Sequence, residues 1–352
     1  MQQNTATLSP VKKNYEFIDA IRGLAMMCIV ADHCFHVEYN RFTTKSINYW
    51  VYATDVQLVK IGTVSFFLLA GFLLGDKFAE YSAWAYLKRR VNSTFKPWLI
   101  WSLVFLYFVI RMAPQDGGTW HWFFADIKTV YLFSNYWFII NFLICISILL
   151  AFKKQLYSLK LGIVLLLFTL FYSVNIYFEW IFPLHTTAVF GFVFFLWLGA
   201  QMQKHWETIK TYVDRTPLGI FAVIVFITCV LAVLETTGLY FSKSMDPFNS
   251  LRITNILYSI AVFFLLVKLN RYNWLLKLTP RETTYGIYLI HYIVIYAFLP
   301  DWLSAFRDKH VEDMSLGGMV AYQVGSFAIT YVVTFVVVKL INNVPIRWVI
   351  GR

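Results

Sequence analysis

Long apolar stretches separated by short polar segments dominate the chain. Ten of them run for about seventeen residues or more with few charges, which is enough to cross a hydrocarbon core of roughly 30 Å at about 1.5 Å per residue. Backbone groups in lipid must bond within their own segment, so each stretch predicts a helix. The predicted spans are 17–36, 58–76, 97–113, 131–151, 159–178, 185–203, 217–238, 251–270, 283–300 and 317–341.

The pattern predicts an all-α polytopic integral membrane protein of about ten transmembrane helices. No run of ten-residue segments alternates as a barrel strand does. We expect a cytoplasmic N-terminal tail (1–16), one transmembrane domain (17–341) and a cytoplasmic C-terminal tail (342–352). The longest predicted connections, 37–57 and 114–130, are too short for a folded domain outside the membrane.

Composition agrees with lipid as the main solvent. Hydrophobic residues make up 59% of the 352 residues and charged residues 14%, against roughly 45–50% and about 25% in ordinary soluble domains. The net charge of +11 could indicate a nucleic-acid partner. The basic residues lie in short loops between apolar stretches, however, so we expect none and interpret them as topology signals.

The Lys and Arg residues predict the orientation. Ten spans place both termini on one side, and that side holds twenty of the thirty basic residues against nine on the other. Positive charge accumulates in the cytoplasm, so both termini are expected there, in the inner (cytoplasmic) membrane. The four cysteines lie in apolar stretches without paired spacing, and neither a disulfide nor a metal site is expected.

The first predicted helix carries an unusual polar group: Asp19, Arg22, Asp32 and His33. At about 100° per residue, the eleven steps from Arg22 to His33 end roughly 20° past three full turns, so these two side chains share one face. They are separated by roughly 16 Å along the axis. Asp19, one turn before Arg22, is the expected partner of that arginine.

Two interpretations of this group remain open. In the structural one, Asp19 and Arg22 form an ion pair at the helix entrance and His33 bonds a neighbouring helix. In the functional one, His33 is a general base, because an imidazole accepts and returns protons near neutral pH. Arg22 then binds an anionic donor such as a phosphate. Ionisable residues within a membrane favour the functional interpretation.

The Arg22 and His33 pair resembles the first helix of the acyltransferase 3 family, in which ten residues separate an Arg from a His. Residues 65–72 resemble the family's Phe-Phe-x-x-Ser-Gly-Phe segment, with Ala70 in place of Ser. Residues 86–90 resemble its basic loop. That loop often has Arg-x-x-Arg, whereas Asn92 and Ser93 follow here.

Two later segments extend the resemblance over essentially the whole chain. Residues 137–138 resemble the family's Trp-Phe-x-x-x-Leu helix, and residues 285–291 resemble its late Tyr-Leu-x-His helix. The five motifs occur in the family's order, which is more specific than any one of them.

The resemblance implies transfer of an acyl group, usually acetyl, from cytoplasmic acetyl-CoA to a carbohydrate hydroxyl. His33, Arg22 and Asp19 are the expected catalytic group. Arg22, Arg89, Arg90 and Lys96 are the expected donor-binding residues, Lys96 standing in for the missing second Arg. Direct transfer and a covalent His intermediate both stay open. Some relatives carry a fused hydrolase-like domain, so a separate envelope-biosynthesis partner is possible.

Five further residues are candidates for binding a glycan acceptor, and each has a structural alternative. Trp137 and Asn141 lie one turn apart and could line a cavity or simply pack. Glu235 could bind a sugar hydroxyl or face water at the interface. Tyr288 and His291 lie on the late aromatic helix, where a hydrogen-bonded core histidine is equally consistent with the sequence.

Two other functions compete with acyl transfer. The same fold could export a polysaccharide or a small hydroxylated substrate, although no matched pair of broken spans indicates an inverted repeat. A scaffold for an envelope pathway would leave Arg22 and His33 without a purpose. The sequence favours the membrane O-acyltransferase.

Overall fold

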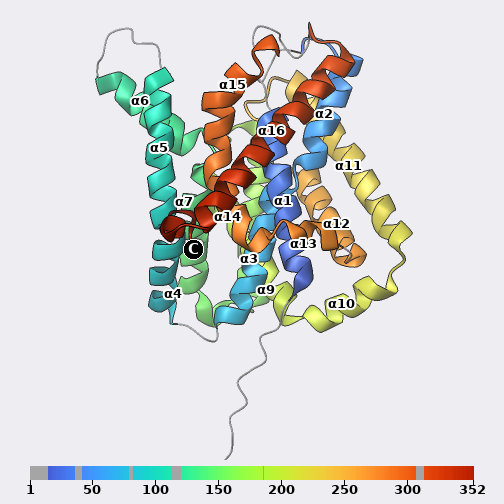
Figure 1. Ribbon diagram of the computed structural model, residues 1–352. Coiled ribbons are helices and arrows are strands. Elements are labelled where there is room, and N and C mark those ends of the chain that lie inside the picture. The colour runs from blue at the N-terminus through green and yellow to red at the C-terminus, as the bar shows by residue number, and fades with distance from the viewer. Residues whose placement is uncertain are drawn as a thin grey trace, which may run out of the picture.

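Helices make up almost all of the computed structural model (Figure 1), which describes residues 15–35, 42–78, 82–112, 120–184, 186–270, 272–306 and 313–352. The chain is 83% helical, and these residues include no strand. The all-α prediction is therefore confirmed.

The α-helices follow one another in chain order with short connections. They are α1 (Glu16–Phe35), α2 (Ile47–Val59), α3 (Gly62–Phe78), α4 (Ala83–Arg90), α5 (Lys96–Met112), α6 (Trp120–Leu132), α7 (Trp137–Ala151), α8 (Leu159–Phe178), α9 (Val189–Lys204), α10 (Trp206–Arg215), α11 (Leu218–Phe241), α12 (Ile253–Leu269), α13 (Asn273–Lys277), α14 (Pro280–Ile293), α15 (Leu299–Trp302) and α16 (Leu316–Asn342). Two π-helical segments, η1 (Val91–Phe95) and η3 (Val294–Phe298), join α4 to α5 and α14 to α15. A 3₁₀ helix, η6 (Pro345–Ile350), follows α16.

Each of the ten predicted spans overlaps a helix, and six helical segments are long and apolar enough to cross a membrane within the described ranges. The six are Ile47–Gly75, Ala83–Met112, Leu159–Phe178, Leu218–Phe241, Pro280–Trp302 and Leu316–Asn342, and the bent pair of α6 and α7 makes up to seven. The chain is a multi-pass membrane protein. Ten spans and the orientation of the termini stay predictions.

The two long connections expected at 37–57 and 114–130 are wrong in part, because α2 and α6 occupy much of them. Tyr49, Tyr52, Ala53 and Val56 are buried at helical spacing, and the Ser46 hydroxyl caps the first turn of α2. The segment expected to form a connection therefore has the periodicity of a helix. With α3 it forms one apolar segment of 29 residues.

Helix α1 lies in the middle of the bundle (Figure 1) and packs against α2, α3, α12, α13, α14 and α16. Neighbouring segments can therefore partner polar residues of α1. Asp32, for example, accepts hydrogen bonds from the buried Lys60 ammonium group at 2.9 and 3.0 Å. Helix α11 lies at the edge of the bundle, and only 11% of its most apolar stretch is buried.

Helices α3 and α9 make the most extensive contact in the bundle through two glycines. A Cβ atom on Gly71 would collide with the backbone carbonyl of Leu196, and a Cβ on Gly199 would collide with that of Leu68. The contact is reciprocal, so the two backbones meet at both points. Small residues allow this close approach in membrane bundles, where packing replaces the hydrophobic effect between helices.

Replacing Gly71 by Ala should destabilise the protein by about 1–3 kcal/mol, because the added methyl group forces α3 away from α9. Thermal unfolding in detergent measures the change. Gly238→Ala is the matched control, since a Cβ there meets no described atom within 4 Å. Equal unfolding temperatures for the two variants would contradict the close contact.

Candidate functional site

The N-terminal end of α1 carries the ion pair that its sequence predicts. Arg22 donates a hydrogen bond from Nη1 to Asp19 Oδ1 at 2.6 Å, one helical turn away. The side chains are 19% and 24% exposed, respectively, so the pair is partly shielded from solvent. Asp19 thereby fixes the direction of the Arg22 guanidinium.

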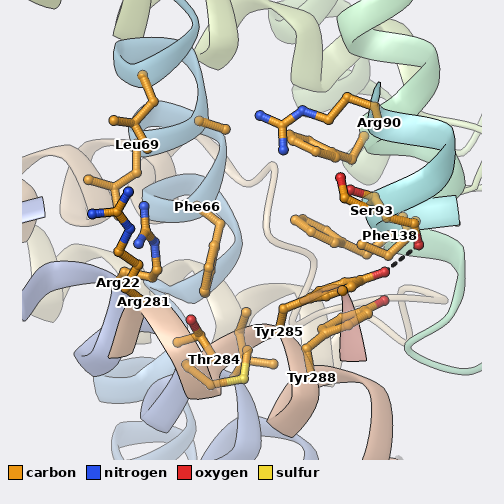
Figure 2. A pocket seen from close by; sticks show the side chains of 18 residues that line it. Arg22, Phe66, Leu69, Arg90, Ser93, Phe138, Arg281, Thr284, Tyr285 and Tyr288 are labelled. Atoms are coloured by element: carbon orange, nitrogen blue, oxygen red, sulfur yellow. Dashed lines mark hydrogen bonds between the residues drawn. The ribbon is translucent and has the colours of Figure 1, made fainter. Parts of the chain in front are cut away.

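A cavity of about 290 Å³ opens beside this pair, between α1, α3, α7, α14 and the segment from α4 to η1 (Figure 2). From α1 it is lined by Arg22, Met26 and Ile29, which follow one another at helical spacing. The face that runs from Arg22 towards His33 therefore borders the cavity, as the eleven-residue spacing predicts. The lining stops at Ile29, one turn before His33.

Three arginines line this cavity: Arg22, Arg90 and Arg281. Figure 2 shows Arg22 and Arg281 on one wall of the cavity and Arg90 opposite them. Arg281 and Arg90 both act electrostatically on Arg22. No carboxylate belongs to the described part of the lining. Converging guanidinium groups repel one another, and an anion relieves that repulsion with bidentate hydrogen bonds.

Sequence reasoning missed Arg281. It lies in the first turn of α14, and Arg281, Tyr285 and Tyr288 follow one another at i, i+4 and i+7. The signal was present in the sequence, since this spacing puts an arginine on the same face as the recognised Tyr288. From the sequence, Arg281 is interpreted only as one of the basic loop residues that predict the membrane topology.

Two further cavities, of about 520 and 210 Å³, adjoin the first and share Ser93 and Gly351 with it. Arg89 lines both of them, which places it at the outer rim. Lys96 is exposed and lines none of the three cavities. Four basic side chains lie on the rim: Lys77, Lys88, Arg89 and Arg352.

The C-terminal segment, residues 342–352, helps to form this rim. The Trp101 indole donates a hydrogen bond to the Val349 carbonyl at 2.9 Å, and Ile350 is buried. Gly351, with φ of 81°, adopts a left-handed conformation close to the Ser93 carbonyl. Arg352 also pairs with Glu282 at 3.2 Å.

The remaining walls of the cavity are apolar and come largely from α3 and α7. Ala70, the residue that departs from the Ser of the resembled motif, belongs to the wall, as do Phe138 and Phe142. Trp137 and Asn141 lie about 100° away around α7 and do not line it. Trp137 packs against aromatic rings, and buried Asn141 accepts a hydrogen bond from Cys145 at 3.1 Å.

His33 and His291 meet one turn beyond the end of this cavity. His33 Nδ1 lies 2.9 Å from His291 Nε2, and the planes of the two rings are inclined by 17°. His291 is fully buried, whereas His33 is half-buried. His33 follows Ile29 by four residues and His291 follows Tyr288 by three, so both faces that line the cavity continue to the histidine pair.

Tyr288 is the one candidate acceptor-binding residue in the lining, and its hydroxyl donates a hydrogen bond to the Asn135 carbonyl. Tyr285, one turn away, donates a hydrogen bond to the Thr94 carbonyl at 2.5 Å. These bonds fasten α14 to α7 and η1 and hold the cavity open between them. No cluster of metal-ligating side chains occurs in the described ranges.

Glu235 lies apart from the cavity, in a polar network between α2, α8, α11 and α12. Its carboxylate accepts hydrogen bonds from Tyr177 and Thr254, and lies 3.8 Å from the fully buried Arg252. Arg252 also donates to Gln57 at 2.7 Å and to the Ala232 carbonyl at 2.9 Å. The network joins four helices, α2, α8, α11 and α12, and a role for Glu235 in acceptor binding stays a prediction.

Replacing Arg252 by Leu should destabilise the fold by about 3–5 kcal/mol, because Glu235 is then left as a buried charge without its partner. The unfolding temperature in detergent measures the loss. Arg215→Leu, at an exposed position at the end of α10, is the control. A variant that unfolds at the wild-type temperature would show that the network contributes little.

Residues 15–339 match the model of the acyltransferase 3 family, described as an acyltransferase domain. The match covers nearly the whole chain, so the protein belongs to this family and is an acyltransferase. A curated relative, the "Probable poly-beta-1,6-N-acetyl-D-glucosamine export protein" of Staphylococcus aureus strain Mu50, is 24% identical over 264 residues, covering 68% of this chain and 70% of the relative. No solved structure shows a significant match.

Proposed function

We propose that the protein is a membrane O-acyltransferase that moves an acetyl group from cytoplasmic acetyl-CoA to a hydroxyl of a cell-envelope or exported carbohydrate. One observation supports this most directly: an apolar cavity opens among three arginines and runs along α1 and α14 towards the His33 and His291 pair. The arginines at one end of the cavity match the anionic headgroup of the donor. The base beyond the other end matches the thioester, which lies far from that headgroup.

The donor site consists of Arg22, Arg90 and Arg281, with Arg89 at the rim. Guanidinium groups bind phosphate oxygens in bidentate geometry, and the phosphates of a coenzyme A headgroup would neutralise this cluster. The apolar walls accept the uncharged arm of the donor. Arg22 and His33 are separated by roughly 16 Å along α1, a distance that an extended arm can bridge.

His33 acts as general base and then as general acid. It takes the proton from the acceptor hydroxyl as the hydroxyl oxygen attacks the thioester carbonyl carbon. The tetrahedral intermediate collapses with cleavage of the carbon–sulfur bond, and the imidazolium returns the proton to the leaving thiolate. The products are the acetyl ester and the free thiol, and His33 is restored.

The direction of transfer follows from the proposed topology. Ten spans with cytoplasmic termini place the arginines, near the start of α1, on the cytoplasmic side of the inner membrane. The acceptor then reaches His33 from the opposite side. The printed name of the S. aureus relative supports a carbohydrate acceptor, and a separate envelope-biosynthesis protein would pass the ester on.

Replacing His33 by Ala should lower acyl transfer by about 10²–10⁴-fold, the contribution of a positioned base. The measurement supplies membranes containing the protein with labelled acetyl-CoA and follows label into a glycan fraction. Exposed His205, replaced by Ala, is the control. Equal transfer by the His33 variant and the wild type would overturn the mechanism.

Replacing Arg281 by Gln should raise KM for acetyl-CoA about tenfold, because one charge-assisted hydrogen bond is worth about 1.5–3 kcal/mol. The value of kcat should change much less, since His33 and its surroundings are intact. Initial rates at varied donor concentration separate the two effects. Arg215→Gln, outside the cavity, should behave as wild type, and an unchanged KM in the Arg281 variant would remove this residue from the donor site.

Polysaccharide export is the second candidate, because the curated relative carries an export protein's name. An exporter would move its glycan whether or not acetyl-CoA is present. Glycan movement in vesicles that lack acetyl-CoA, unaffected by His33→Ala, would favour export over acyl transfer.

A further inference from the structure

The arrangement around His291 assigns hydrogen positions to both histidines. His291 Nδ1 lies 3.0 Å from the backbone carbonyl of Ile287, one turn earlier on α14. A carbonyl oxygen only accepts, so His291 Nδ1 carries the hydrogen of this bond. Burial disfavours a charged ring, and no carboxylate among the described residues contacts His291. A neutral His291 therefore has its lone pair on Nε2.

The contact with His33 then has a defined direction. Two nitrogens 2.9 Å apart need one hydrogen between them, and His291 Nε2 is the acceptor. His33 Nδ1 must be the donor. In a neutral imidazole only one nitrogen carries a hydrogen, so the lone pair of His33 is on Nε2, the ring nitrogen opposite the contact.

We propose that His291 is a positioning residue that holds His33 in the tautomer with a basic Nε2, through the hydrogen-bonded series Ile287 carbonyl, His291 and His33. The proposal rests on the proposed function, in which His33 is the base. His291 Nε2 also accepts from His33 while that ring is an imidazolium, so the hydrogen bond keeps the ring oriented through proton uptake and release.

This role differs from acceptor binding, which the sequence suggested for His291. Both ring nitrogens of His291 are engaged within the protein, and the side chain is fully buried. Its edge-to-face contact with Tyr292, which also contacts His33, closes the pair on another side. The polar contact that links the buried ring to the proposed reaction is the one with His33.

The test compares His291→Leu with His291→Gln. Leucine fills the space but accepts no hydrogen bond, whereas the glutamine amide oxygen reaches about as far as Nε2. We expect His291→Leu to lower kcat by about 100-fold, the lower end of what a positioned base contributes, with KM for acetyl-CoA unchanged. His291→Gln should recover most of that loss. His205→Leu repeats the change at an exposed histidine.

The outcomes separate this inference from the proposed function. If His291→Leu keeps the wild-type kcat while His33→Ala is inactive, His291 does not position the base, yet the transferase mechanism stands. If His33→Ala keeps full activity, both fail. Equal loss in folded Leu and Gln variants would also overturn the positioning role. If the Leu variant does not fold, His291→Asn replaces it, because the shorter Asn side chain cannot reach His33. Equal kcat values for the Asn and Gln variants would then contradict the positioning role.

Discussion

Every polar side chain on α1 has to be partnered inside an apolar bundle, and this requirement organises the protein. Charged or hydrogen-bonding groups left alone in lipid or in a packed core cost several kcal/mol. Asp19 and Arg22 satisfy each other within the helix at 2.6 Å. Asp32 requires Lys60 after α2, and His33 requires His291 from α14. Polar contacts at fixed positions along α1 thus hold this central helix against its neighbours.

These ties also bear on the position of the cavity, which lies beside the arginines and ends one turn before the histidine pair. The histidine pair joins α1 to α14 directly, whereas Arg22 and Arg281 on the same two helices repel each other. Because α1 and α14 attract each other at the histidines and repel each other at the arginines, space between these two helices is favoured on the arginine side. Phe66, Phe138 and Ala70 line that space without offering any group that could neutralise the arginines.

Local periodicity accounts for what the sequence could predict. Helical spacing alone placed Asp19 beside Arg22 and put Arg22 on the face that leads to His33, and long apolar stretches located ten helices. Contacts between distant segments were not predictable in this way. The pairing of His33 with His291 joins positions 258 residues apart. Helix α7 is apolar around most of its circumference, so its sequence could not tell whether Trp137 or Phe138 faces the cavity.

The polar face of α1 has a consequence for how the protein is made. The translocon disfavours Asp and Arg by about 2.5–3.5 kcal/mol each at the centre of a helix, and α1 is not among the described segments that qualify as spans by length and composition. Helix α11, the most apolar of those segments, can rest in lipid unaided. His291, the partner of His33, is synthesised 258 residues after it, so α1 leaves the ribosome long before it reaches its final surroundings. Biogenesis therefore needs a means of holding α1 until α14 arrives.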